Sequence, residues 1–483
     1  MCRPWSGSDV IPRHALCLIL MAVLAARPAC AATGDSRTVV EPSIPAACGQ
    51  PLLATLQPKQ RVFADALERR PPDTARIQAA LDRCASVGRG RGAVLLRAGT
   101  GSAFLSGPLR IGSDVTLAID AGVTLFASRN PSDYQNPGRN RCGQAAARSG
   151  ACRALITLEG RALGVMGVRD RAGHQGSIDG RGDLPMLGSD DSWWRFARKA
   201  KADGLTQNNP DLIRAQSVAD LRVYHVNLLN APYFHLFVHG GDGVTVWGVR
   251  VKAPANSPNT DGLDLDSVTN ATLFDNDVMT GDDGVAIKTS AASSANITVR
   301  ASRFYGTHGI SIGSEVMHGV GNVLVDGNSL VGHDADDIVA TDNNGLRIKT
   351  GLAKGGPVRD VTYRNTCLFG VAKPLVINPL YGGGHGGRGA VPTFERIVVD
   401  GLKAQDTPTG KSGVVQGYSA AAPLDLVLAH VSADVTTLKI DNARIGVDRS
   451  NLQVNADSAV TTYAASVAGT VPVCDSPPVF PTL

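Results

Sequence analysis

The sequence is poor in aromatic residues, in runs of like charge and in long apolar segments. Aromatics make up 5% of the 483 residues, whereas Gly is abundant with 54. This balance favours many short strands joined by tight turns. No apolar run reaches the roughly 18 residues of a membrane-spanning helix. The formal net charge of +4 comes without Lys/Arg clusters, so we expect no nucleic-acid partner and no membrane insertion of the mature chain; a polyanionic partner is compatible.

The segment 1–31 has the layout of a secretory signal. Arg3 and Arg13 precede the apolar stretch 15–26, and Ala29-Cys30-Ala31 offers a small-residue cleavage site. A lipoprotein signal at this cysteine and a buried N-terminal helix are the alternatives. We therefore expect a secreted, extracellular protein whose mature part begins at residue 32.

The cysteines have no zinc-type spacing, so a metal role is not indicated. Removal of residues 1–31 leaves an even number of them, which in an exported chain argues for disulfides. Cys142 and Cys152 are close in sequence and pair easily. The pairs Cys48–Cys84 and Cys367–Cys474 would then follow by elimination, although other connectivities are open.

One sequence pattern recurs at intervals of about 25 residues from residue 90 onward. It consists of an Asn, Asp or Gly followed by a short strand in which apolar residues alternate with others. Successive copies begin at Asp220, Gly243, Asn270, Asn296, Asn322 and Asp360. Strand repeats of this size without intervening helices indicate a β-solenoid, in which stacked coils share one core. A sandwich or barrel seldom keeps a nearly constant period. The sequence predicts an all-β fold, a right-handed single-stranded parallel β-helix, as one domain over 32–483.

The open ends of a solenoid must be covered. Ile77, Ala80, Leu81 and Cys84 fall at i, i+3, i+4 and i+7, which predicts a short N-terminal capping helix. A second helix is expected over Ser192–Lys201, after an acidic turn.

Three aspartates and a histidine recur in phase with the repeat. Asp282 and Asp283 follow Asp261 by 21 and 22 residues, and His308 follows Asp282 by 26. Arg347 comes one longer interval later, which holds an insertion. Residues one repeat apart lie on adjacent rungs, about 4.8 Å apart. Because grouped carboxylates of different protonation perform glycoside hydrolysis, we expect these residues to form the catalytic site of a polysaccharide-cleaving enzyme.

A pair of cations accompanies the acids. Arg347 and Lys349 are separated by one residue and therefore point to the same side of a strand, where they would bind a substrate carboxylate. His308 would tune the protonated acid through a hydrogen bond or its charge.

Other polar residues are interpreted as structural. Asp and Asn often cap solenoid turns. In this class we place Asp264, Asp266, Asp275 and Asp277. The pair Asp336-Asp337 is expected on a surface loop, His318 and His333 in solvent, and Arg181-Gly-Asp183 at a turn.

At these segments the chain resembles the polygalacturonases, a pectin-cleaving family of inverting glycoside hydrolases, and especially their bacterial secreted endo-acting members. The motifs are Asn259-Thr260-Asp261, Gly281-Asp282-Asp283, His308-Gly309 and Arg347-Ile348-Lys349. The similarity extends over most of the mature chain, from Ser192 to Asn378.

The resemblance implies a role for each matching residue. Asp282 would be the general acid, Asp261 and Asp283 would hold and activate the water, and His308 would support protonation of the acid. It also implies four substrate-binding residues. Arg347 and Lys349 would bind a galacturonate carboxylate, Asn259 would lie in the groove floor, and Tyr381, after the Arg-Ile-Lys segment, would contact the substrate. No metal or other cofactor is expected, and we expect a monomer.

Two positions depart from the family pattern. Thr307 stands where members usually have Gly, and Gly284 where bacterial members often have Asn. The insertion around 334–341 should adjoin the groove and reshape one wall.

Four alternatives stay open at this point. An exo-acting enzyme would need loops that close one end of the groove, and a relative specific for decorated pectin would keep the same catalytic motifs. A pectate lyase would use calcium and an arginine base on the same fold. A non-catalytic β-helix binding protein would lack clustered titratable residues.

Overall fold

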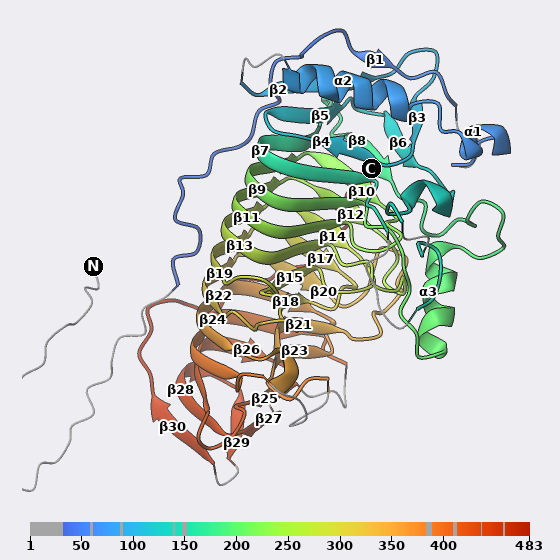
Figure 1. Cartoon of the computed structure of the whole chain (residues 1–483). Coiled ribbons are helices and arrows are strands. Elements are labelled where there is room, and N and C mark those ends of the chain that lie inside the picture. The colour runs from blue at the N-terminus through green and yellow to red at the C-terminus, as the bar shows by residue number, and fades with distance from the viewer. Residues whose placement is uncertain are drawn as a thin grey trace, which may run out of the picture.

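The computed structural model describes most of the chain as a stack of coils (Figure 1). The described residues are 32–57, 61–86, 90–138, 141–146, 152–382, 389–408, 413–435, 437–456 and 459–483. The predicted signal segment 1–31 lies outside them. No helix within these ranges has the length and apolarity needed to cross a bilayer.

Each coil contributes strands to three parallel faces, and each strand pairs with its equivalent in the next coil. The first face, called the groove sheet below, contains β4 (Leu109–Ile111), β7 (Ile156–Gly167), β9 (Ile213–Tyr224), β11 (Leu236–Trp247), β13 (Leu263–Phe274), β15 (Val285–Lys288), β18 (Ile310–Ile312), β21 (Asn344–Lys349), β23 (Lys373–Asn378), β25 (Val414–Gln416), β27 (Thr437–Asp441) and β29 (Gln453–Ala456).

The long strands β7, β9, β11 and β13 bend, and their second halves belong to the second face. That face also contains β1 (Leu52–Leu53), β2 (Gly92–Arg97), β5 (Val115–Ile119), β16 (Ser294–Arg300), β19 (Val320–Asp326), β22 (Pro357–Phe369), β24 (Thr393–Gln405), β26 (Leu424–Ala433), β28 (Ala443–Ser450) and β30 (Val460–Ala464).

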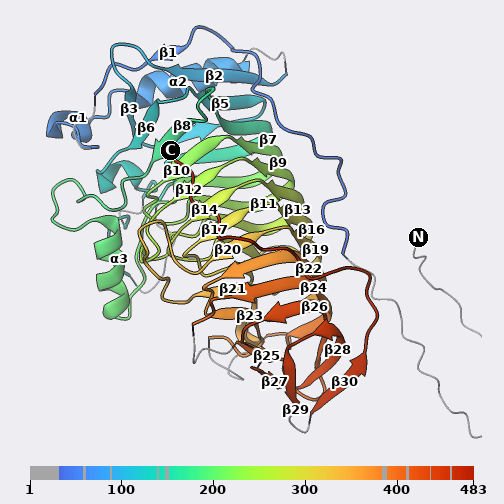
Figure 2. The same cartoon turned by 180° about the vertical axis from the view of Figure 1, so that it is seen from behind.

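The third face contains β3 (Ala103–Ser106), β6 (Thr124–Ala127), β8 (Gly176–Asp179), β10 (Val226–Leu229), β12 (Arg250–Lys252), β14 (Asp277–Met279), β17 (Arg303–Tyr305) and β20 (Ser329–Val331), followed by the ends of β22, β24 and β26. The prediction of a right-handed parallel β-helix is therefore confirmed (Figures 1 and 2).

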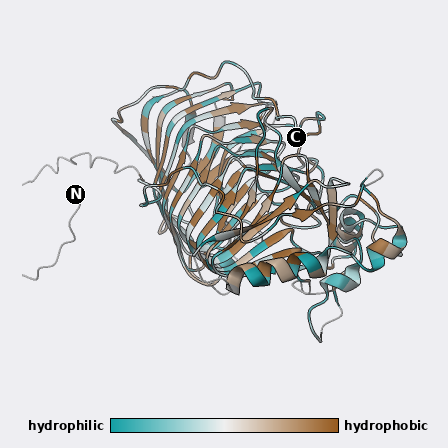
Figure 3. Ribbon diagram, turned by 90° about the horizontal axis from the view of Figure 1, so that it is seen from above, coloured by the Kyte–Doolittle hydropathy of each residue, from teal (hydrophilic) through white to brown (hydrophobic). Residues whose placement is uncertain are grey.

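The core consists of apolar residues stacked in register from coil to coil. Leu263, Val285, Ile310 and Leu346 are consecutive partners on the groove sheet, and each is at most 1% exposed. Apolar and polar residues alternate along the stacked strands (Figure 3). A single coil can bury little, and the stack supplies the partner surfaces.

The Asn and Asp residues that open each repeat adopt the left-handed backbone at a corner. Asn270, Asn296 and Asn322 have φ of 54°, 58° and 53°. Their side chains form a ladder, in which Asn296 Nδ2 donates to Asn270 Oδ1 at 3.1 Å and Asn322 Nδ2 to Asn296 Oδ1 at 2.8 Å. Asn tolerates this conformation better than most residues, which explains why Asn recurs at the start of the repeats.

Helices cover the N-terminal end and one side. α2 (Thr74–Ser86) lies over the first coils and α1 (Asp65–Arg69) lies at their side, as Figure 1 shows. Buried Ile77 and Leu81 of α2 contribute to the core, so the capping helix is confirmed. The expected second helix is α3 (Trp193–Ala202), and two short 3-10 helices are η1 (Pro131–Tyr134) and η2 (Leu352–Lys354).

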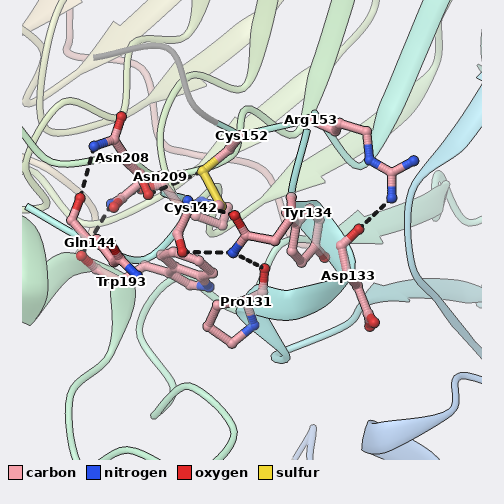
Figure 4. Close-up of a disulfide and its surroundings, with 12 residues drawn as sticks. Pro131, Asp133, Tyr134, Cys142, Gln144, Cys152, Arg153, Trp193, Asn208 and Asn209 are labelled. Carbon is pink, nitrogen blue, oxygen red and sulfur yellow. Dashed lines mark hydrogen bonds between the residues drawn. A yellow bond between two sulfur atoms is a disulfide. The ribbon is translucent and has the colours of Figure 1, made fainter. Parts of the chain in front are cut away.

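The three expected disulfides are present: Cys48–Cys84, Cys142–Cys152 and Cys367–Cys474. The first ties α2 to the start of the chain. The second closes a loop beside Tyr134 and Trp193 (Figure 4). The third anchors the C-terminal tail to β22.

The Arg181-Gly-Asp183 turn has a structural role beyond a bend. Arg181, φ 53°, is fully buried and forms an ion pair with Glu68 of α1 at 2.7 Å. Arg129 donates to the same carboxylate at 3.2 Å. The turn therefore fixes α1 to the first coils.

Candidate active site

The predicted catalytic residues lie at one corner of successive coils, where each groove-sheet strand begins. Asp261 precedes β13, Asp282 and Asp283 precede β15, and His308 precedes β18. The corner backbones hydrogen-bond to one another: His308 N donates to Asp282 O at 2.8 Å, and Gly262 N to Asp283 O at 2.9 Å. Each interval read from the sequence is therefore one rung.

Asp283 is the most tightly held of the three carboxylates. It is 2% exposed and accepts hydrogen bonds from Lys349 Nζ at 2.7 Å and Ser311 Oγ at 2.8 Å. Arg347 Nη1 lies 3.6 Å from the same carboxylate. These contacts fix the direction of the carboxylate.

Asp282 is the carboxylate that reaches solvent, with 20% of its side chain exposed. His308 Nδ1 lies 3.0 Å from its Oδ1, and Asn259 Nδ2 donates to its Oδ2 at 3.4 Å. Burial alone would raise the pKa of Asp282. The hydrogen bond and charge of His308, with the positive charge of Lys349, lower it to about 2.

Asp261 has the opposite electrostatic setting. It is 5% exposed, and its Oδ1 has no hydrogen-bond partner among the described residues. Burial and the charges of Asp282 and Asp264 raise the pKa of Asp261 well above its usual range. Two neighbouring carboxyls with pKa values pushed apart are a typical acid/base arrangement.

Asp264 does not occupy the turn position expected from the sequence. It lies inside β13, is fully buried and pairs with Lys288 Nζ at 2.5 Å. Burial raises the pKa of Asp264 to about 7 against the pull of this ion pair. Asp266, two residues later, is likewise in β13 and not at a turn. Period-two alternation in Leu263-Asp-Leu-Asp was the signal that these side chains face outward beside the site.

Of the other structural assignments, Asp275 lies at a corner with φ 53°, as expected. Asp277 is the first residue of strand β14 and not a turn residue, and it pairs with Arg303 at 2.5 Å. The Asp336-Asp337 pair is exposed, as are His318 and His333.

The cation pair faces the groove, as expected from its spacing in β21. Arg347 and Lys349 are 4% and 7% exposed. The Tyr381 ring covers both, with its centroid 5.3 Å from Arg347 Cζ and 5.5 Å from Lys349 Nζ. Tyr381 itself is 40% exposed. The structure therefore brings all eight predicted site residues to one place.

The insertion does adjoin the groove. Thr341 Oγ1 lies 3.5 Å from His308 Nε2, and Asp342 Oδ2 accepts from Arg347 Nη2 at 2.7 Å. The positive charge of Arg347, with Lys373, outweighs burial and lowers the pKa of Asp342. This wall therefore touches both the histidine and the arginine of the site.

The two departures from the family pattern are neighbours in space. A Cβ at Gly284 would lie 2.6 Å from Phe304 Cδ1 and 3.1 Å from Thr307 Oγ1. Phe304 is a core residue at 1% exposure. Thr307 thus fills the space that a larger residue at position 284 would need.

Metal binding is opposed by the local charges. Ligand atoms of Asp282, Asp283 and His308 lie within 4.8 Å of one another, a spacing that suits a cation. Lys349 and Arg347, however, lie against Asp283, and cations in that position compete with a metal ion. The donor set fits an anionic ligand better than a metal.

The groove sheet continues N-terminally past the acids. Arg214 of β9 pairs in register with Phe237 of β11, which pairs in turn with Asp264 of β13. Arg214 therefore lies two rungs before Asp264. A cavity of about 870 Å³ begins there, lined also by Arg110 and Arg153. Charged side chains therefore continue along the solenoid axis on the same face, where Arg214 pairs with Asp211 at 2.7 Å and Arg110 with Glu159 at 2.9 Å.

Comparison with known proteins agrees with this geometry. Residues 100–414 match the model of the glycosyl hydrolases family 28. The chain is 35% identical to a polygalacturonase of Ralstonia solanacearum, covering 90% of this chain and 88% of that protein. It is 36% identical to an endo-polygalacturonase of Pectobacterium carotovorum subsp. carotovorum, covering 86% and 94%.

A solved structure gives the same result for the fold. The polygalacturonase of Erwinia carotovora ssp. carotovora superposes with a TM-score of 0.68 and 32% identity, covering 90% of this chain and 99% of that one. The chain is therefore a glycoside hydrolase and belongs to the glycosyl hydrolases family 28.

Proposed function

We propose that the chain hydrolyses the α-1,4 bonds of polygalacturonan inside the polymer, with inversion at the anomeric carbon. The observation that carries this proposal is the convergence of Asp261, Asp282 and Asp283 beside the buried cations Arg347 and Lys349. Carboxylates of unequal pKa supply acid and base, and the cations select a uronate next to them. Relatives named polygalacturonase support the substrate class.

In the proposed mechanism Asp282 protonates the leaving oxygen, because it is the carboxyl that reaches the groove. Asp261 and Asp283 hold the water on the opposite face, and Asp261 accepts its proton. The high pKa of Asp261 and the low pKa of Asp282 place the single shared proton on Asp261 in the free enzyme.

Substrate binding would move this proton toward Asp282. The charge of Lys349 is one of the causes that lower the pKa of Asp282. A galacturonate carboxylate bound to Lys349 and Arg347 neutralises that charge, so the pKa of Asp282 rises. The acid would thus become protonated in the complex that needs it.

The endo mode is supported by the length of the groove sheet on the N-terminal side of the acids. Arg214 and the cavity beyond it extend the groove sheet N-terminally from Asp264. A long polyanion lying along the axis would contact several coils on that side of the cut. The relative from Pectobacterium carotovorum carries the endo designation.

Secretion is part of the proposal. Disulfides such as Cys367–Cys474, which links positions 107 residues apart, suit an oxidising compartment. The layout of residues 1–31 supplies the export signal, and 32–483 would act as a monomeric catalytic unit.

The test is incubation of the mature protein with polygalacturonic acid, with and without chelator. Viscosity, reducing ends and ultraviolet absorbance are followed together, and Asp282→Asn is the control. We expect a fast viscosity drop at few reducing ends, resistant to chelator, without absorbing products and absent in the variant. Slow viscosity loss would indicate an exo mode, and absorbing products that need calcium would indicate a lyase. No cleavage would redirect the search to decorated pectins.

A further inference from the structure

Lys288 is the buried cation of the site that the mechanism above does not use. Its Nζ lies 2.5 Å from Asp264 Oδ2 and 3.6 Å from Asp261 Oδ2. Its side chain is 13% exposed, and the Phe234 ring lies 4.8 Å from Nζ. Within the described part of the chain its ion pairs are to these two aspartates.

The arrangement follows from strand register. Asp264 and Asp266 of β13 alternate with Leu263 and Leu265. The two leucines are buried in the core, so the two aspartates point out of it. Lys288 is the β15 partner of Asp266, one rung toward the C-terminus, and reaches back to Asp264. Asp264 thus anchors the ammonium group beside Asp261.

The charges of this corner do not balance without a proton. The carboxylates are Asp261, Asp264, Asp282 and Asp283, and the permanent cations that pair with them are Lys288, Arg347 and Lys349. Arg347 and Lys349 lie against Asp283. Lys288 is therefore the cation that decides how easily Asp261 ionises.

We propose that Lys288, anchored by Asp264, is a positioning residue whose charge stabilises the carboxylate of Asp261 once its proton has moved to Asp282, and directs that carboxylate toward the attacking water. The inference rests on the proposed hydrolytic function. No bond to Lys288 forms or breaks; its charge stabilises the form in which Asp261 accepts the proton of water while Asp282 donates one.

Other titratable groups surround the pair from neighbouring strands and loops. They are Asp211, Tyr233, Asp266, Asp282, Asp283 and Glu315. Asp282 and Asp283 act with burial to raise the pKa of Asp261, so Lys288 opposes them. His235 lies against the backbone carbonyl of Asp261 at 3.1 Å, and burial lowers its pKa to about 4. Above that pH His235 is neutral and does not replace Lys288.

Two substitutions should move the same titration in opposite directions. Lys288→Met removes the charge that lowers the pKa of Asp261, so that pKa rises. Asp264→Asn removes a charge that raises it and leaves the ammonium group to Asp261 alone, so that pKa falls. Since Asp261 holds the shared proton in the free enzyme, its pKa sets the alkaline limb of kcat/KM.

The first experiment measures kcat/KM on polygalacturonic acid against pH. For Lys288→Met we expect the alkaline limb to move up by about one pH unit and the plateau to fall about tenfold. The reactive form has the shared proton on Asp282 and not on Asp261, and a rise of one unit in the pKa of Asp261 makes that form about tenfold rarer. Asp264→Asn should lower the limb, and Lys288→Arg should restore it. Lys201→Met, at an exposed site of α3 and not on the groove sheet, is the control for net charge.

The outcomes are decisive in each direction. Opposite movements of the limb support the role, whereas unmoved limbs or movements in the same direction overturn it, since a packing defect alone would lower activity without this signature. The double variant Lys288→Met/Asp264→Asn removes both partners of the 2.5 Å ion pair, so that neither is left buried without the other, and shows whether folding is at fault.

A second measurement keeps the inference separate from the proposed function. The carboxyl carbon of Asp261 is titrated by NMR in ¹³C-aspartate-labelled protein, with Asp261→Asn for assignment. The two variants should shift this titration in opposite directions even if the enzyme cleaves some other glycan. An inactive wild type with the expected shifts would overturn the substrate assignment and support Lys288; an unshifted titration would overturn the role of Lys288.

Discussion

Asp283→Asn should separate binding from catalysis in this site. The carboxylate of Asp283 neutralises Lys349 at 2.7 Å and faces Arg347 at 3.6 Å. An amide of the same shape leaves both cations without a counter-charge. We expect kcat to fall about 10²–10⁴-fold, the range for loss of an acid/base group. Galacturonate oligomers should bind more tightly, because their carboxylate replaces the missing charge.

The magnitude for folding follows from the same contacts. Breaking a buried ion pair by removing one partner costs about 3–5 kcal/mol, so the ligand-free variant should unfold at lower denaturant. Saturating trigalacturonate should recover part of that loss. Calorimetric Kd values and denaturant midpoints with and without ligand measure both effects.

A matched control is Asp277→Asn in β14, where the lost partner is Arg303 at 2.5 Å, on another face of the solenoid. It should show the stability loss without tighter ligand binding. The reasoning is refuted if Asp283→Asn binds the oligomers more weakly than wild type, or if the Asp277 variant also gains affinity.

Three further predictions concern other contacts. Glu68→Gln should destabilise the protein by about 3–5 kcal/mol in denaturant titrations. Burial would raise the pKa of Glu68, but its two arginine partners lower it. The stability that Glu68 contributes is therefore present above its unfolded pKa and is lost as pH falls through its folded pKa. The variant should no longer show this loss of stability at low pH. His308→Ala should raise the pKa of Asp282 from about 2 and move the acidic limb of kcat/KM upward; an unmoved limb contradicts the assignment. Replacing Cys142 and Cys152 by Ala should cost about 2–4 kcal/mol by thermal unfolding with little change in kcat.

The catalytic corner could be predicted because the fold is periodic. A constant repeat converts sequence separation into height along the axis, so Asp261, Asp282 and His308 had to meet once the period was known. The corner asparagines gave that period through their left-handed backbone. Helix α2 was found from its apolar spacing in the same way.

Asp264 and Lys288 could not be assigned in this manner. Asp264 is three positions after Asp261, a spacing that the sequence shares with ordinary turn residues. Their pairing depends on the lateral position of a side chain across two rungs. The same holds for Arg181, a turn residue in the sequence that proved to be buried against Glu68.

The sequence alone determined the coil, its period and the set of residues at the catalytic corner, because each depends on order and spacing along the chain. The structure settled the disulfide pairs, for which the spacing of the cysteines had left several connectivities open. Only the tertiary structure decided which carboxyl is ionised. Protonation depends on burial and on distances between groups from different rungs, such as 3.0 Å from His308 to Asp282 and 3.6 Å from Lys288 to Asp261. These distances arise from stacking, and spacing along the chain does not encode them.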